Sequence, residues 1–260
     1  MTDATPQRLA SSPATRSPLN VIVIVAALGY FVDVYDLILF GIVRQTSLRD
    51  LGFTSAEEIK TVGMMLMNWQ MAGTLVGGIL WGVLGDRRGR VSVLYGSIIL
   101  YSIANGANGL VQDTTTYAVL RFVAGVGLAG ELGAGITLVA ETMHKRSRGW
   151  GTTIVASVGV CGAVLAYAVA DWFDWRTAYF VGGALGLALL AMRFATYESS
   201  MFKRILAGRA SRLQLGRFDL LFRRPRRLGK YLASIGVGLP ISFSIGLLMF
   251  FADHFGRALG

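Results

Sequence analysis

Four ionisable side chains interrupt apolar stretches of the sequence, where a charge is costly unless it has a partner or a function. They are Asp33, Asp36, Arg121 and Glu131. Asp33 and Asp36 are three residues apart, so on a helix they lie on one face. Three carboxylates and one arginine cannot all stay ionised in a dry interior. At least one carboxyl must therefore take up a proton or open onto water, and the set can bind and release a proton inside an apolar protein.

The composition predicts that these charges lie in membrane-spanning helices. Of the 260 residues, 53% are hydrophobic and only 15% are charged, whereas about a quarter are charged in a typical soluble domain. A spanning helix needs roughly 20 mostly apolar residues. The first apolar run is too long for a signal-peptide core and is expected to stay as a helix. The expected spans are 19–43, 62–85, 91–111, 117–140, 151–171, 177–197 and 231–252.

Basic residues gather in alternate loops and predict the orientation. Most of the 25 lysines and arginines lie near the N-terminus, in the loops at 86–90 and 145–148, and between Lys203 and Lys230. We therefore expect a multi-pass protein of a bacterial-type inner membrane with a cytoplasmic N-terminus. The formal net charge of +10 is then a consequence of topology, and no nucleic acid partner is expected. The basic segment before the last span is expected to lie on anionic lipid headgroups.

Depth counting makes Asp36 and Arg121 candidates for an ion pair. Asp36 lies roughly 10 Å below the outer end of the first span, and Arg121 about 6 Å below the outer end of the fourth. Asp33 and Glu131 fall near the middle of their spans. A carboxylate that takes up a proton releases its arginine partner, which is the chemistry that a proton-coupled carrier needs. The alternative is that these charges only line a hydrated cavity or tie helices together.

The segment GVLGDRRGRV, residues 82–91, forms a tight turn between the second and third expected spans. Its glycines allow close helix approach and unusual backbone angles, and Asp86 can accept hydrogen bonds from backbone donors or an arginine. A plain cytoplasmic turn would explain the arginines but not the ordered spacing of glycine, aspartate and arginine. On this motif the sequence resembles the major facilitator superfamily, whose hallmark loop between helices two and three has this pattern.

Further motifs resemble the sugar porters and metabolite:proton symporters of that superfamily. Arg121 and the glycines after it in the fourth span are followed by Glu141 and Arg148 in the next loop. The segment VYDLILFG around Asp36 is similar to the first helix of proton-linked sugar porters, where an aspartate pairs with the arginine matched here by Arg121. This resemblance makes Asp36 the first candidate for the proton site, with Arg121 as its counter-ion. The resemblance covers residues 19–200 well, and 201–260 only by position.

The resemblance implies an all-α integral membrane fold. A cytoplasmic tail over 1–18, expected to be disordered, would precede a major facilitator-type six-helix bundle over 19–197. A basic linker over 198–230 would then lead to a seventh transmembrane helix in 231–260, the start of an incomplete second half. In the family a charge network of the cytoplasmic loops latches one conformation. The resemblance assigns this conformational gating to Gly82, Asp86, Arg87, Gly89, Arg90, Glu141 and Arg148.

Polar side chains in the second and third spans are candidates for lining a solute cavity: Asn68, Gln70, Asn105 and Asn108. Hydrogen bonding between helices is an equally good explanation for each. Arg193, near the cytoplasmic end of the sixth span, is expected to extend its charged end into the interface. His144 and His254 have no partner at metal-ligand spacing, so no metal site and no cofactor are expected.

These features favour a secondary active transporter of a small organic solute, carboxylate or sugar-like, working by proton symport. Its expected partners are the solute, protons and membrane lipids. The family has twelve helices in two halves with the substrate between them, so a second half or a second copy is a further expected partner. The alternatives are a truncated, non-transporting membrane protein or assembly partner derived from such a transporter, and a membrane enzyme. No arrangement of catalytic residues favours the enzyme.

Overall fold

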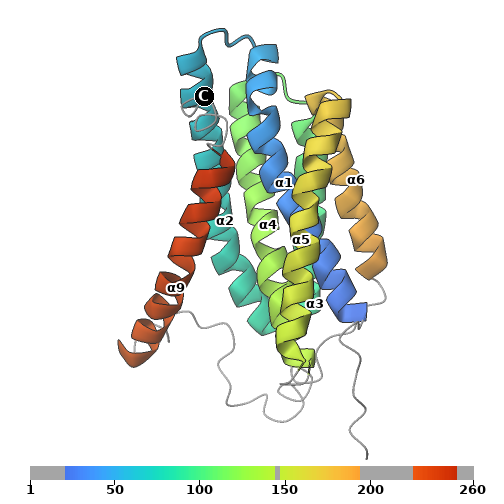
Figure 1. Ribbon diagram of the computed structural model, residues 1–260, viewed down its shortest axis with the longest axis vertical. Coiled ribbons are helices and arrows are strands. Elements are labelled where there is room, and N and C mark those ends of the chain that lie inside the picture. Colours follow the sequence, from blue (N-terminus) through green and yellow to red (C-terminus); the bar gives the residue numbers. More distant parts are fainter. Residues whose placement is uncertain (1–20, 144–146, 194–224, 251–260) are drawn as a thin grey trace, which may run out of the picture.

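The computed structural model describes residues 21–143, 147–193 and 225–250, and each of the seven expected spans corresponds to a helix in it (Figure 1). The all-helical prediction is confirmed. The helices are α1 (Val21–Asp50), α2 (Ala56–Arg88), α3 (Arg90–Asn108), α4 (Thr114–Thr142), α5 (Arg148–Trp172), α6 (Trp175–Arg193) and α9 (Pro225–Phe250).

Two of the helix boundaries that differ from the predicted ones have clear reasons. α1 continues to Asp50 instead of ending at residue 43, because Arg44, Ser47 and Leu48 are still buried against the bundle. α9 begins at Pro225, inside the segment predicted as linker, since proline suits the first turn of a helix. The predicted tail (1–18), the remainder of the linker (198–224) and residues 251–260 lie outside the described residues.

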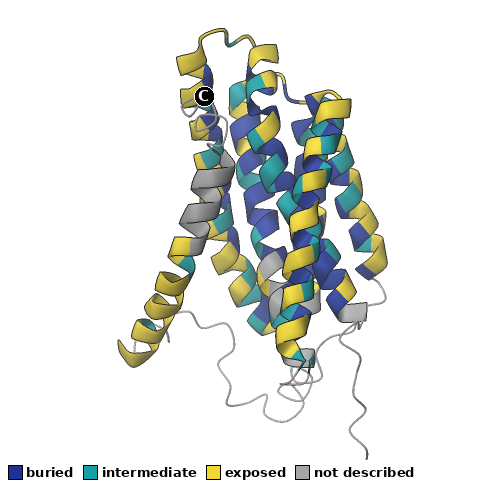
Figure 2. Cartoon of the chain, viewed as in Figure 1, coloured by how far each residue is buried: buried dark blue, intermediate teal, exposed yellow. Residues whose placement is uncertain are grey.

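α1 and α4 are the helices that position the charged residues. α4 packs along α2 and α3, while α1 packs along α5 and also contacts α4 and α6 (Figure 1). Buried residues concentrate on α1, α4 and the inward faces of their neighbours (Figure 2). α9 lies at the edge of the bundle, where it contacts α1. The four ionisable residues of the sequence analysis are therefore carried by the two helices with the most neighbours inside the bundle.

Glycines set the spacing of the two closest helix pairs. A Cβ atom on Gly125 of α4 would meet the backbone carbonyl of Gln70 on α2, and one on Gly162 of α5 would meet the backbone carbonyl of Phe31 on α1. Backbone atoms cannot rotate away as a side chain can. These two helix pairs can therefore approach only because glycine stands at both contacts.

The loops at the end of the bundle where α1 ends are held by helix caps. The Asp113 carboxylate accepts hydrogen bonds from the backbone N–H of Thr116 at 2.8 Å and from its hydroxyl at 2.7 Å, and so starts α4. These bonds lower the pKa of Asp113. Asp174 caps α6 in the same way through Arg176 and Thr177, and its pKa is lowered too. Both carboxylates lie outside the predicted spans.

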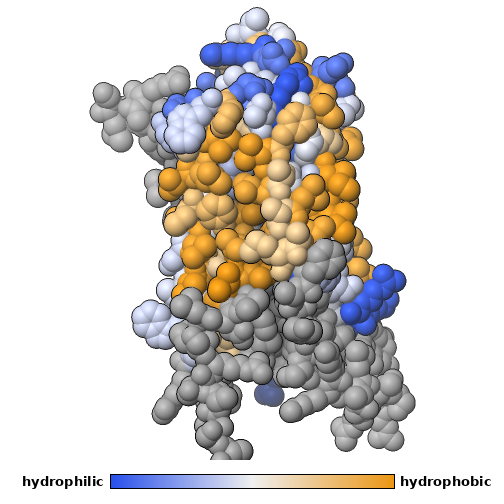
Figure 3. Space-filling view, turned by 90° about the vertical axis from the view of Figure 1, so that its right-hand side faces the viewer, coloured by the Kyte–Doolittle hydropathy of each residue, from blue (hydrophilic) through white to orange (hydrophobic). Residues whose placement is uncertain are grey.

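The surface is that of a membrane protein, although the helices differ in apolarity. A broad apolar band covers the face in Figure 3, below a hydrophilic rim at the upper end of the bundle. By length and composition alone, three described stretches can cross a membrane, Val23–Asp50, Arg148–Trp172 and Trp175–Arg193. α3 and α4 carry polar residues that face the bundle interior, among them Asn105, Arg121 and Glu131.

Candidate functional site

Asp36 and Arg121 meet in the centre of the bundle, and both side chains are fully buried. Arg121 Nη2 lies 3.6 Å from Asp36 Oδ1. Gln70 of α2 donates a hydrogen bond from Nε2 to Asp36 Oδ2 at 3.3 Å. Arg121 donates from Nη2 to Asn105 at 2.8 Å and from Nε to Asn108 at 3.3 Å, both on α3. One charge pair thus draws together α1, α2, α3 and α4.

The ion pair is incomplete. At 3.6 Å the contact is too long for a hydrogen bond. Among the described residues, Asp36 Oδ1 and Arg121 Nη1 have no hydrogen-bond partner. A buried acceptor and a buried donor that lack partners raise the free energy of the folded state by roughly 1–3 kcal/mol each. The pair therefore has capacity to take up a proton on the aspartate side and an anion on the arginine side.

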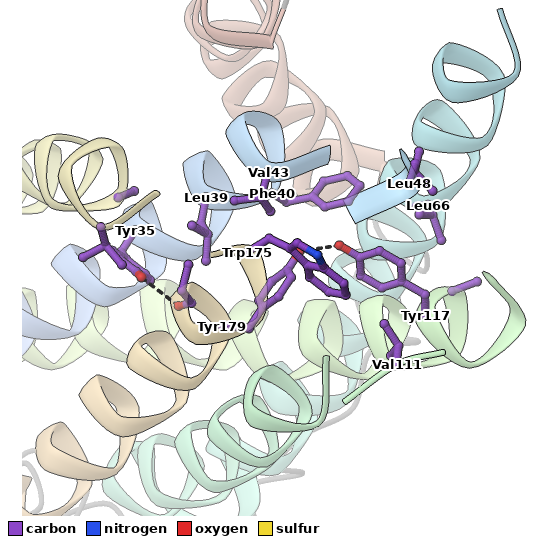
Figure 4. Packing of buried hydrophobic residues seen from close by; sticks show 14 of the residues in the cluster. Tyr35, Leu39, Phe40, Val43, Leu48, Leu66, Val111, Tyr117, Trp175 and Tyr179 are labelled. Atoms are coloured by element: carbon purple, nitrogen blue, oxygen red, sulfur yellow. Dashed lines mark hydrogen bonds between the residues drawn. The ribbon is translucent and has the colours of Figure 1, made fainter. Parts of the chain in front are cut away.

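Aromatic rings cover the arginine on the side toward the end of the bundle where α1 ends. The Arg121 guanidinium carbon lies 4.9 Å from the ring centre of Tyr179 and 5.5 Å from that of Phe40, within cation–π range. The hydroxyls of Tyr117 and Tyr179 are 2.7 Å apart; Trp175 stacks on Tyr117 and meets Tyr179 edge-on. Figure 4 shows this cluster, with the Tyr35 hydroxyl donating to the Ala178 carbonyl.

No role was predicted for these aromatic residues from the sequence, although a signal for two of them exists. Phe40 follows Asp36 by four residues and Tyr117 precedes Arg121 by four, so each ring lies one turn from a charge on the same helix face. Tyr179 comes from α6 and has no such local relation to the pair. The aromatic cover could be anticipated on α1 and α4 but not on α6.

Glu131 forms a second buried pair, and its partner corrects the expectation for Arg193. Instead of extending to the interface, Arg193 is only 2% exposed, and its Nη2 lies 2.6 Å from Glu131 Oε2. Arg193 Nη1 donates to Glu131 Oε1 at 3.0 Å, and the Ser97 hydroxyl donates to the same oxygen at 3.0 Å. Two arginines, not one, therefore face the three carboxylates.

Asp33 is the carboxyl without a cation of its own. It is 3% exposed, and neither of its oxygens has a hydrogen-bond partner among the described residues. The charges of Glu131, Arg193 and Asp36 all act on it. Together with Arg193, the four predicted proton-coupling residues therefore form two ion pairs, Asp36–Arg121 and Glu131–Arg193, and leave Asp33 unpaired.

The four predicted cavity residues do not lie together. Gln70, Asn105 and Asn108 are buried around the Asp36–Arg121 pair. Asn68 is exposed and faces away from the pair, in a shallow pocket of about 390 Å³ on the outer face of α2. Residues two apart on a helix point in different directions, so Asn68 and Gln70 belong to different surfaces.

The predicted gating residues surround the turn between α2 and α3 and the start of α5. Gly89 joins α2 to α3 with a φ of 97° and a ψ of 159°. Asp86 is half-buried, while Gly82, Arg87 and Arg148 are exposed. Gly82 lines a cavity of about 240 Å³ between α2, α3 and α4. The side chains of Arg90 and Glu141 lie outside the described residues. The gating role of this set stays a prediction.

Replacing Gly89 by alanine is expected to destabilise the fold by about 1–3 kcal/mol, because its backbone angles are essentially restricted to glycine. Gly82→Ala is the matched control: it lies in the same segment, and nothing stands within 4 Å of the added Cβ atom. Thermal unfolding of the purified protein should show a lower Tm for Gly89→Ala and an unchanged or higher Tm for Gly82→Ala. Equal Tm values for the two variants would contradict the assigned turn geometry.

A family profile and the sequences of known proteins both relate this chain to one family of transporters. Residues 26–260 match the profile of the Major Facilitator Superfamily. A putative metabolite transport protein of Haemophilus influenzae is 29% identical over 249 residues, which is 90% of this chain and 59% of the relative. A putative niacin/nicotinamide transporter of Bacillus subtilis is 29% identical over 191 residues, 72% of this chain and 46% of the relative. The chain thus spans about half the length of these relatives.

Solved structures show the same fold. The crystal structure of a D-xylose–proton symporter superposes with a TM-score of 0.68 at 19% identity, and the match covers 92% of this chain and 62% of the symporter. At this identity the likeness concerns the arrangement of helices. The six-helix bundle with α9 at its edge is therefore an architecture already known from transporters.

Proposed function

Because this chain belongs to the major facilitator superfamily, we propose that it is part of a secondary transporter that carries a small organic solute together with a proton. The protein acts as a multi-pass carrier in the inner membrane with its N-terminus in the cytoplasm. The relatives are longer than the chain, and a second half or a second copy completes the solute cavity. The reaction is movement across the membrane, with no covalent change to the solute.

The incomplete Asp36–Arg121 pair is the observation that carries this proposal. Both residues are fully buried, yet they lie 3.6 Å apart, and each has an atom without a hydrogen-bond partner. A proton on Asp36 removes the negative charge that holds Arg121. The freed guanidinium then changes its partners, which alters the relative stability of the two conformations of the carrier. Proton binding is thereby coupled to the conformational change.

Arg121 also favours a carboxylate among the possible solutes. A guanidinium binds a carboxylate through two parallel hydrogen bonds, and Arg121 Nη1 has no partner among the described residues. The anion can replace Asp36 at Arg121 at the moment when Asp36 is protonated. Solute anion and proton then enter the protein with no net charge. A sugar-like solute would instead use Gln70, Asn105 and Asn108 as its hydrogen-bond partners.

Uptake into vesicles tests the proposal. The full chain, alone and together with a complementary second half, is reconstituted and offered a panel of radiolabelled carboxylates and sugars with an inward proton gradient. At least one solute should accumulate above its external concentration, and a protonophore should abolish the accumulation. Accumulation that persists in the presence of the protonophore would exclude proton symport. No uptake of any solute by the completed protein would favour the non-transporting alternative.

A further inference from the structure

A second charged cluster lies where α1, α3, α4 and α6 meet, and it brings Arg193 to the predicted carboxyls Glu131 and Asp33. Arg193, the last residue of α6, contacts both carboxylate oxygens of Glu131 on α4, at 2.6 and 3.0 Å. Ser97 of α3 donates to Glu131 at 3.0 Å, and the Leu94 carbonyl accepts from Arg193 at 3.4 Å. Arg193 is thus committed to one carboxylate by a two-point contact.

Gly29 lets this pair rest directly on α1. A Cβ atom at position 29 would collide with Arg193 Nη2 and would lie 3.2 Å from Glu131 Oε2. Asp33 is one turn further along the same face of α1, four residues after Gly29. Because glycine has no side chain, nothing at position 29 stands between the Glu131–Arg193 pair and the turn of α1 that carries Asp33. The electrostatic effect of Glu131 and Arg193 on Asp33 follows from this arrangement.

Every helix packed around Asp33 contributes to its surroundings. The charged or titratable side chains that interact with it electrostatically are Tyr30 and Asp36 from α1, Tyr101 from α3, Glu131 from α4 and Arg193 from α6. α5 packs against α1 at this level through Gly159 and Gly162. Neither oxygen of Asp33 has a hydrogen-bond partner among the described residues. An ionised Asp33 would add a third negative charge to a region that already holds two ion pairs.

We propose that Arg193 is a positioning residue of proton coupling: by holding Glu131 ionised, it leaves Asp33 as the carboxyl that carries the proton while Asp36 is paired with Arg121. The inference rests on the proposed proton symport. In this state the buried set contains two guanidinium ions, two carboxylates and one carboxylic acid, so its net charge is zero. Neutrality is the expected condition of a dry interior, where an uncompensated charge is strongly disfavoured.

The proton balance is simple. A proton from water forms one O–H bond at Asp33 and later leaves to water or to Asp36, three residues away on the same face of α1. At each transfer one O–H bond breaks on the proton donor, which is hydronium on entry and the Asp33 carboxyl on exit, and one O–H bond forms on the acceptor. Arg193 does not exchange protons itself, because a guanidinium stays charged in proteins. Because its guanidinium lies against Glu131, Glu131 stays ionised and the neighbouring Asp33 is the neutral carboxyl.

Infrared spectroscopy of the full chain in lipid vesicles at neutral pH tests this assignment, because a buried carboxylic acid has its own C=O band. The native protein should show one such band, and Asp33→Asn should lose it. Glu131→Gln should lose it as well, although Asp33 is intact, because Arg193 then becomes the partner of Asp33. Arg193→Gln should instead show a second acid band, from Glu131. The double variant Glu131→Gln/Arg193→Gln should regain the single Asp33 band.

A purely structural Arg193 would leave the Asp33 band unchanged in Glu131→Gln, and this result would overturn the proposal. A band that survives in Asp33→Asn would place the proton elsewhere and would overturn it too. If Glu131→Gln does not fold, Arg193→Gln and the double variant still decide, since a missing second band in the former or no band in the latter refutes the assignment. If the spectra are as expected but a proton gradient drives no uptake, proton symport is refuted and the assignment of the proton to Asp33 stands.

Discussion

Asp36→Asn is expected to abolish solute accumulation driven by a proton gradient while leaving solute exchange across the membrane in place. Asparagine keeps the size of aspartate and still accepts a hydrogen bond from Gln70, but its charge cannot change with pH. The variant therefore imitates the protonated carrier at all times. A gradient of one pH unit corresponds to about 1.4 kcal/mol, which supports roughly tenfold accumulation by one-to-one symport. In the variant, internal and external concentrations should become equal.

Asp50→Asn is the matched control for this prediction. Asp50 is on the same helix and also contacts an arginine, Arg176 at 3.1 Å, but that pair is partly exposed. An exposed pair contributes roughly 0–1 kcal/mol, so accumulation should stay near the native level. The measurement is radiolabelled uptake with and without a pH gradient, together with counterflow from preloaded vesicles. Full accumulation by Asp36→Asn would remove Asp36 from proton coupling.

The Asp36–Arg121 contact could be anticipated from the sequence because it depends on two one-dimensional quantities. Hydropathy locates the ends of each span, and a fixed rise per residue converts position into depth. Residues of opposite charge at similar depth then become candidate partners. Counting cannot give the 3.6 Å separation or the unsatisfied atoms, because these depend on how closely α1 and α4 pack. The pairing of these two residues could be predicted from the sequence, whereas their missing hydrogen bonds could not.

The buried position of the Arg193 side chain could not be predicted from the sequence. Position near a predicted span end suggests a side chain that reaches the interface, yet Arg193 points inward and is 2% exposed. The reason is tertiary: Glu131 provides a carboxylate from another helix, and Gly29 leaves space for the guanidinium. Neither relation has a sequence spacing to indicate it. The same limit applies to Asn68 and Gln70, where the helix rotation decides which one contacts Asp36.

The Gly125 contact explains how the fold maintains this site. Gln70, which donates to Asp36 of α1, lies on the segment of α2 that packs against Gly125 of α4. A Cβ atom on Gly125 would lie 3.0 Å from the backbone nitrogen of Thr74 and closer still to the Gln70 carbonyl oxygen. Backbone atoms cannot yield without moving the helix. Any side chain at position 125 therefore displaces the segment of α2 that carries Gln70.

Gly125→Ala is expected to lower the free energy of unfolding by about 1–3 kcal/mol, the usual cost of overpacking a tight interior. It should also weaken proton-driven accumulation, because the displaced Gln70 no longer donates to Asp36. Gly133→Ala on the same helix is the control, since its added Cβ atom has nothing within 4 Å. Thermal unfolding in detergent gives the first effect and vesicle uptake the second.

Thermal unfolding and vesicle uptake together separate the effect of helix packing from that of the Gln70–Asp36 hydrogen bond. Gln70→Ala leaves the α2–α4 contact intact and removes only the hydrogen bond, so it should reproduce the transport defect of Gly125→Ala with a smaller loss of stability. A Gly125→Ala protein with native Tm would show that α2 can shift at little cost, against the backbone contact described above. A Gln70→Ala protein with native accumulation would show that the hydrogen bond to Asp36 does not contribute to coupling. The effect of Gly125→Ala on transport would then have to arise from packing alone.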